Sequence, residues 1–278
     1  MKPSILTGWL IFWLHLSSAL AAPPQRVVSL SLCSDQLLLM LADRQQVALV
    51  SHLATDPQNS YMSSQARGIP NHRGRLEEII AGQPDLILTS PYTNPRLLHS
   101  LKQLGYPLHT LTLGQDPEQI ADDIRRLAER LGQSSRGETL IREFRQRIAA
   151  QSEAGEHNLP SALFLQPRGY TSGRDTLQDQ AMKLSGWRNR AAEMGLKGYI
   201  QADLEQLIAW RPDALVTSPY TDASDSRAQR LLLHPALKRL LGDQPLYVIP
   251  YKDWICPGPM LADAVERLRQ IRTQIQLP

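Results

Sequence analysis

The sequence predicts an α/β protein of two similar lobes, each built on a parallel sheet, joined by a long helical spine. One segment occurs twice: residues 76–94 and 204–222 lie 128 positions apart and are identical at eleven of nineteen positions. Around each copy, apolar β-branched runs alternate with stretches of helical spacing, the pattern of parallel strands with crossover helices. Residues 116–155, between the two lobes, show helical spacing only.

The N-terminal lobe is expected over residues 22–115. Its opening strand, RVVSLSL, precedes a helical period for which Ser34 is the expected N-cap. In the repeated unit, Pro84 separates a short helix from a buried strand. The expected strands are residues 26–32, 47–53, 85–90 and 107–113, and the expected helices are residues 34–42, 76–83 and 94–105.

The C-terminal lobe is expected over residues 156–278 and repeats this scheme. Its strands are expected at residues 161–166, 213–218 and 245–250, and its helices at residues 177–186, 204–211, 229–242 and 260–275. In an open α/β sheet, ligands bind beyond the carboxyl ends of the parallel strands. The two lobes therefore predict a ligand cleft between them.

Composition and the N-terminus restrict the class of protein. The formal net charge is only +3, with basic and acidic residues interspersed, so no nucleic-acid-binding surface is indicated. Lys2, the apolar run that follows and the small residues Ala19 and Ala21 predict a signal peptide over residues 1–21. Cleavage would release the chain into the periplasm, whereas the alternative is an uncleaved membrane anchor.

The repeated motif Ser-Pro-Tyr-Thr follows a strand end in each lobe. Tyr92 and Thr93 in the first copy and Tyr220 and Thr221 in the second are therefore expected to face the cleft. An aromatic pair of this kind can hold a flat ligand, while hydroxyl groups bind its polar rim. The alternative is that each ring packs on its own lobe.

Other strand ends supply further candidates for the ligand site. Cys33, Ser34 and Asp35 follow the first strand, and Trp254 follows the last, where it lies near the cleft floor or packs in the core. Residues 167–175 are interpreted as a flexible loop that carries Arg168 and Tyr170. Its arginines are either ligands for carboxylate or phosphate groups or solvated surface charges.

The order of these segments resembles a known family. An exported leader, an RVVSL strand, LEEIIAGQPDLILTS, a helical stretch and LEQLIAWRPDALVTS are together similar to the periplasmic binding proteins of the iron-siderophore, haem and cobalamin type, the ligand-capturing components of ABC importers. The resemblance implies two Rossmann-like lobes, a monomer, a metal chelate as ligand (cobalamin, a ferric siderophore or haem) and no separate cofactor. Its implied partner is a permease dimer in the inner membrane.

The resemblance also implies a role for Glu77 and Glu205. These residues occupy matching positions in the two copies, where the family places glutamates that dock onto arginines of the permease. From the residues alone, the favoured interpretation is that both are acidic groups placed in the first turn of a helix by its dipole. Glu78 is an alternative contact to Glu77.

The two cysteines, Cys33 and Cys256, are expected to pair because an exported chain with an even number of cysteines usually forms disulfides. Thiolate ligands for a metal, or two free thiols, are the alternatives. A bare zinc or manganese ion is a second candidate ligand, but His52 and His72 belong to no metal-binding spacing. No nucleophile elbow or phosphate-binding loop is found, so an enzyme is not expected.

Overall fold

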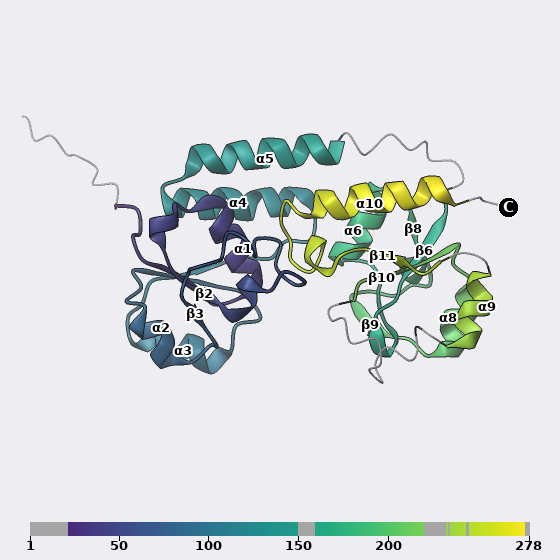
Figure 1. Cartoon of the computed structure of the whole chain (residues 1–278), viewed down its shortest axis with the longest axis horizontal. Helices are drawn as coiled ribbons and strands as arrows, with labels where there is room; N and C mark the ends of the chain where they lie inside the picture. Colours follow the sequence, from purple (N-terminus) through teal and green to yellow (C-terminus); the bar gives the residue numbers. More distant parts are fainter. Residues whose placement is uncertain (1–21, 150–158, 220–231, 233, 243–244, 276–278) are drawn as a thin grey trace, which may run out of the picture.

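Two α/β lobes lie side by side beneath a layer of helices (Figure 1). The computed structural model describes residues 22–149, 159–219, 232, 234–242 and 245–275. The expected signal peptide, residues 1–21, lies outside the described residues. Within them, no helix combines the length and the apolar character needed to cross a membrane.

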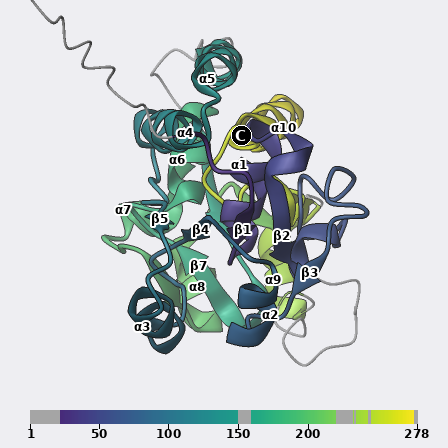
Figure 2. The ribbon, with the colours of Figure 1, turned by 90° about the vertical axis from the view of Figure 1, so that its left-hand side faces the viewer.

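The N-terminal lobe contains a five-stranded parallel sheet. Its strand order is β3-β2-β1-β4-β5, which Figure 2 shows from the end of the molecule. Alternate residues face opposite sides of the sheet: Val27 packs toward α1 and α4, whereas Val28 packs toward α2 and α3. The elements are β1 (Val27–Ser29), β2 (Val47–Ser51), β3 (Asn71–His72), β4 (Leu86–Thr89), β5 (Leu108–Thr110), α1 (Leu32–Leu41), α2 (Leu76–Ala81) and α3 (Pro95–Gln103).

The C-terminal lobe contains a four-stranded parallel sheet in the order β11-β10-β6-β8 and a separate antiparallel pair, β7-β9. The expected flexible loop over residues 167–175 is wrong, because residues 170–172 form β7 and hydrogen-bond with β9. The elements are β6 (Ser161–Phe164), β7 (Tyr170–Ser172), β8 (Arg188–Asn189), β9 (Tyr199–Gln201), β10 (Ala214–Thr217), β11 (Tyr247–Val248), α6 (Leu177–Leu184), α7 (Arg190–Glu193), α8 (Leu204–Trp210) and α9 (Pro235–Leu241).

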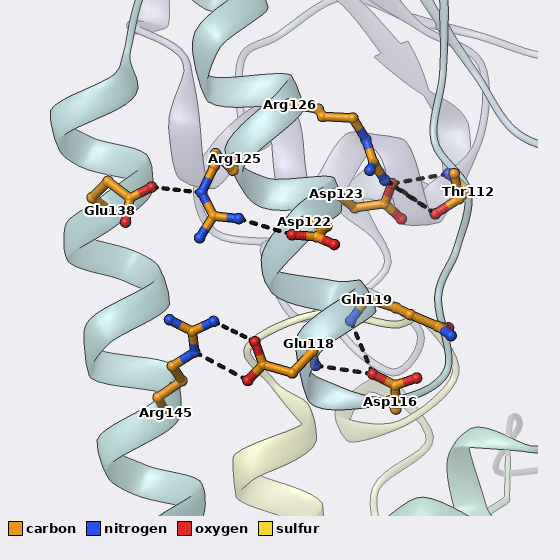
Figure 3. A network of polar contacts seen from close by, with 10 residues as sticks. All are labelled: Thr112, Asp116, Glu118, Gln119, Asp122, Asp123, Arg125, Arg126, Glu138 and Arg145. Atoms are coloured by element: carbon orange, nitrogen blue, oxygen red, sulfur yellow. Dashed lines mark hydrogen bonds and ion pairs between the residues drawn. The ribbon is translucent and has the colours of Figure 1, made fainter.

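Three helices form the upper layer: α4 (Pro117–Leu131), α5 (Ser134–Ala149) and α10 (Leu261–Gln274). Helices α4 and α5 run antiparallel, and ion pairs from Arg125 to Glu138 and from Arg145 to Glu118 join them (Figure 3). The residues beneath this layer form one core that continues from the first lobe, through the helices, into the second. A shared core of this kind holds the two lobes in a defined relative position.

Helix α4 also fixes a loop that reaches the cleft. Asp123 is buried in this helix, and its carboxylate accepts a hydrogen bond from the backbone N–H of Thr112 at 3.0 Å (Figure 3). It accepts another from the backbone N–H of Leu113 at 2.9 Å. Arg126 Nη2 forms an ion pair with Asp123 Oδ1 at 2.8 Å. The segment after β5 is therefore anchored to the helical layer, and Leu113 is held at the cleft wall.

The repeated Pro-Asp unit has the same structural role in both lobes. Asp85 accepts hydrogen bonds from the backbone of Gln25 and Arg26, just before β1, and Asp213 accepts one from the backbone of Ser161 at the start of β6. Each aspartate thus ties the central strand of its repeat to the opening strand of its lobe. The motif therefore recurs because it sets the same strand pairing twice.

The N-terminus of α1 differs from its expected form. Ser31, not Ser34, is the N-cap, and its side chain accepts a hydrogen bond from the Ser34 backbone at 3.3 Å. Ser34 is the third residue of the helix and is fully buried, with hydrogen bonds to Ser29 and Ser31. The helix therefore begins earlier than its periodicity indicates, which leaves Ser34 and Asp35 inside the lobe.

Candidate functional site: the cleft between the lobes

A cleft of about 630 Å³ separates the lobes where the carboxyl ends of their strands meet. Its position agrees with the rule for open α/β sheets. The N-terminal lobe contributes Ser31, Cys33, Leu53, Ser90, Tyr92 and Leu113. The C-terminal lobe contributes Leu177, Tyr199, Tyr251, Ile255, Cys256 and Pro257. This volume lies within the range of small-molecule and cofactor sites.

Tyrosines from both lobes form the aromatic part of the lining. Tyr92 projects from the N-terminal lobe with 83% of its surface exposed, so its ring does not pack on its own lobe. Tyr199 and Tyr251 lie on the C-terminal side. The sequence analysis missed Tyr199 because β9 is only three residues long and its partner β7 lies far away in the chain, so no local pattern marks it.

The hydroxyl of Tyr199 is held in place although part of the ring is exposed. It donates a hydrogen bond to Gln178 Oε1 at 2.9 Å. Burial of the hydroxyl, together with the nearby Tyr92 and Tyr251 hydroxyls, raises the pKa of Tyr199 to about 12. At neutral pH this phenol keeps its proton, so it offers a hydrogen-bonding hydroxyl and an aromatic face, not a phenolate.

The two cysteines form a disulfide that lines the cleft. Cys33 lies in α1 and Cys256 in the segment after β11, and their Cα atoms are 5.1 Å apart. The bond joins one lobe to the other across 223 residues of sequence. Both residues belong to the cleft lining, so the disulfide is a cross-link and also part of the surface that a ligand meets.

Several residues that the sequence analysis assigned to the site lie inside the lobes. Ser34 and Asp35 are fully buried, and Thr93 is 9% exposed, with its hydroxyl accepting a hydrogen bond from the Ser90 backbone at 2.9 Å. Arg168 is exposed but lies outside the lining of the cleft. Tyr170 lines a smaller pocket beside the cleft. Tyr220 and Thr221 lie outside the described residues.

Trp254, which the sequence analysis assigned to the ligand site, lies in the core. Its ring is 1% exposed and packs edge-on against Phe164, with ring centroids 4.9 Å apart. The indole N–H donates to Ser218 Oγ at 2.8 Å, and that hydroxyl donates to the Ile249 carbonyl at 2.7 Å. Trp254 thus fixes the segment that carries Cys256, but its ring does not line the cleft.

Glu77 and Glu205 occupy equivalent places on the outer surface. Each is the second residue of its helix, α2 or α8, and each side chain is exposed. The residue after each one caps its own helix: Glu78 accepts from the backbone of the N-cap Arg75 at 3.4 Å, and Gln206 accepts from the backbone of the N-cap Asp203 at 3.0 Å. Glu78 also accepts from the Arg73 backbone at 2.7 Å. Glu78 is therefore occupied within the lobe, whereas Glu77 and Glu205 point away from it without an ion pair to any described residue.

Asp35 makes stability depend on pH. Burial raises the pKa of Asp35 to about 7, although hydrogen bonds from Ser51 oppose this shift. The unfolded chain releases this proton near pH 4, so between about pH 4 and 7 only the folded protein retains it. The free energy of unfolding therefore falls as the pH rises through this interval, and the contribution of Asp35 becomes constant above it.

We expect this dependence to be absent in Asp35→Asn. Between pH 5 and pH 7, wild-type protein should lose about 2–3 kcal/mol relative to the variant, at ~1.4 kcal/mol per pH unit. Urea unfolding of both proteins at pH 5, 6 and 7 measures the difference, and other titrating groups cancel in the comparison. Parallel pH profiles for the two proteins would contradict the prediction.

These features define a two-lobed binding protein with its ligand site between the lobes. Within the described part of the chain, no three His, Cys, Asp or Glu residues gather as metal ligands. The periplasmic binding protein family matches residues 27–241, and the chain belongs to this family. It is a binding protein and not an enzyme.

Individual relatives agree with this assignment. The vitamin B12-binding protein of Photorhabdus laumondii is 29% identical over 277 residues, which cover 96% of this chain and 94% of that protein. Among solved structures, a periplasmic haem-binding protein from Pseudomonas aeruginosa superimposes with a TM-score of 0.76 at 24% identity, covering 92% of this chain and 95% of that one. An Fe³⁺-hydroxamate transport protein from Saccharomonospora viridis gives 0.72 at 22% identity, with coverages of 89% and 93%. These two similarities show the fold.

Proposed function

We propose that this chain captures a metal chelate in the cleft between its lobes and delivers it to an ABC permease in the inner membrane. The observation that carries the proposal is the cleft itself: strand ends of both lobes converge on it, and Tyr92 and Tyr199 line it from opposite lobes. Aromatic faces suit a large flat chelate such as a corrinoid or a porphyrin. The vitamin B12-binding relative, aligned over nearly the whole chain, supports a corrinoid first.

The proposal is tested by titrating the mature protein, residues 22–278, with cyanocobalamin, haemin and the ferric hydroxamate ferrichrome. Trp254 reports binding, because its indole lies beneath the cleft against Phe164 and its fluorescence is quenched by energy transfer to a coloured chelate. We expect one chelate to bind with 1:1 stoichiometry in isothermal titration calorimetry. Free zinc is the control, and a response to zinc alone would overturn the proposal.

Removing the aromatic walls should weaken this binding strongly. Truncating a ring that stacks on a flat ligand costs about 1–3 kcal/mol, so Tyr92→Ala and Tyr199→Ala should each raise the Kd by roughly 5–150-fold. Neither change is expected to lower thermal stability much, because both rings are largely exposed. Tyr106→Ala, in a half-buried tyrosine that packs on the core of the N-terminal lobe outside the cleft lining, is the control for affinity. Unchanged affinity in both wall variants would place the ligand elsewhere.

A further inference from the structure

A side pocket of about 250 Å³ opens beside the cleft in the C-terminal lobe. Tyr199, Tyr251 and Ile255 belong to the linings of both spaces, so the two are continuous at these residues. The rest of the pocket is built from β6, β7 and α6 and the turns between them. A ligand that fills the cleft can therefore extend a substituent into the C-terminal lobe.

The wall of this pocket contains a hydroxyl group without a partner. Thr171 in β7 is 1% exposed, and its Oγ1 atom has no hydrogen-bond partner among the described residues. A buried polar group without a partner is unfavourable, and it calls for a specific explanation. A bound molecule that supplies the missing hydrogen bond is one. The hydroxyl can both donate and accept a hydrogen bond.

The neighbouring amide groups determine what else the pocket offers. Gln178 Oε1 accepts hydrogen bonds from the hydroxyls of Tyr199 at 2.9 Å and Ser172 at 3.4 Å. Its Nε2 donates one hydrogen bond, to the Trp254 carbonyl at 3.3 Å. Gln166 donates through Nε2 to the Ser218 carbonyl at 3.3 Å, which leaves its Oε1 able to accept a hydrogen bond. The pocket thus presents an amide carbonyl and a hydroxyl, a combination that matches the N–H and C=O groups of a carboxamide.

The described lining of the pocket is uncharged and consists of aromatic, aliphatic, hydroxyl and amide side chains. A carboxylate that entered it would lose its hydration without gaining a counter-ion, whereas a neutral amide would exchange water for the groups above. The pocket therefore favours a carboxamide over a carboxylate, although the two groups have nearly identical shapes.

We propose that the side pocket is a subsite for an uncharged, hydrogen-bonding arm of the ligand, a primary carboxamide, and that Thr171 selects it. This inference rests on the proposed function, because the arm belongs to a chelate held in the cleft. It narrows the ligand to a chelate whose periphery carries amides and not free carboxylates at this position.

The test compares ligands that differ only in this group. The first pair is cyanocobalamin and its monocarboxylic acids, in which one side-chain amide is hydrolysed. The second pair is haemin, with free propionates, and its bis-propionamide. In the pair that binds, we expect the amide ligand to have a Kd at least about tenfold lower than that of the weakest-binding acid. The reason is that the charge of a buried carboxylate would lack a partner.

Two variants isolate the hydroxyl of Thr171. Thr171→Val keeps the shape of the side chain and should weaken binding of the amide ligand roughly fivefold, the loss of one hydrogen bond. Thr217→Val is the matched control, because Thr217 is also buried with an unpartnered hydroxyl but lies outside both linings. Both variants should be as thermally stable as wild type or slightly more so, since each removes a buried hydroxyl without a partner.

The outcomes are distinct. Amide preference in wild type, reduced by Thr171→Val and retained by Thr217→Val, supports the subsite. Equal binding of amide and acid, equal behaviour of the two valine variants, or binding of ferrichrome alone overturns the subsite and leaves the proposed function standing. If cyanocobalamin, haemin, their derivatives and ferrichrome all fail to bind, the proposed function fails and the subsite fails with it.

Discussion

Replacing both cysteines, in Cys33→Ala/Cys256→Ala, is expected to lower the free energy of unfolding by about 2–5 kcal/mol. The corresponding fall in Tm is roughly 5–15 °C for a chain of this size. The effect is large because the cross-link spans 223 residues, so it restricts most of the unfolded chain. Thermal unfolding followed by circular dichroism measures it.

A reducing agent distinguishes the contribution of the disulfide bond to stability from that of side-chain packing. Dithiothreitol should lower the Tm of wild-type protein by a similar amount and leave the double variant unchanged. If the double variant loses stability and reduced wild type does not, the loss comes from packing of Cys256, which is 1% exposed, and not from the bond. Replacing both residues avoids the free thiol that a single variant would leave.

The same variant tests how freely the lobes separate. The disulfide and a hydrogen bond from Tyr61 in the N-terminal lobe to Asp263 in α10, 2.9 Å long, both join the lobes on the side of the helical layer. We infer that the lobes change their angle little when ligand binds. Small-angle X-ray scattering should therefore show a wider range of lobe separations in the double variant, and in reduced wild-type protein, than in oxidised wild type. Ligand should also dissociate faster from both.

The strand-helix alternation and the duplicated Pro-Asp segment were sufficient to predict the fold, because they report local periodicity and a repeated local contact. Asp85 and Asp213 make the repeated contact, since each accepts a backbone hydrogen bond at the start of the strand that opens its own lobe. The strand-end rule likewise predicted that Tyr92 faces the cleft, and Tyr92 lies in its lining.

The rule failed where a side chain at a strand end turns inward. Trp254 and Asp35 follow strand ends as expected, yet one completes the core and the other accepts hydrogen bonds from Ser51. Periodicity cannot show which way a side chain outside a regular element points. Tyr199 was missed for the opposite reason: its position depends on pairing between β7 and β9, which no local pattern encodes.

The double variant Glu77→Ala/Glu205→Ala is expected to bind its chelate with unchanged affinity and to lose transport. Both glutamates are exposed on the first turns of α2 and α8, away from the cleft lining. Figure 1 shows these helices on the same side of the molecule, opposite the layer of α4, α5 and α10. Two equivalent carboxylates on one face suit a two-fold symmetric basic partner such as a permease dimer.

Uptake of the labelled chelate, in cells whose only copy of the protein is the variant, should fall by ~10-fold or more, because lost charge complementarity slows docking. Each single variant should be intermediate, since one lobe can still engage. The Kd of the purified variant should equal that of wild type, because neither residue lines the cleft.

The control must separate docking from net charge. Glu129→Ala/Glu143→Ala removes the same two negative charges from exposed positions on α4 and α5, on the opposite side of the molecule. If charge alone governed the encounter with the permease, both double variants would impair uptake equally. If Glu77 and Glu205 only stabilise their helices through the dipole, the first variant would lose about 0.3–1 kcal/mol of stability per residue, and transport would continue. Selective loss of uptake in the first variant, with a wild-type Kd, assigns these glutamates to docking.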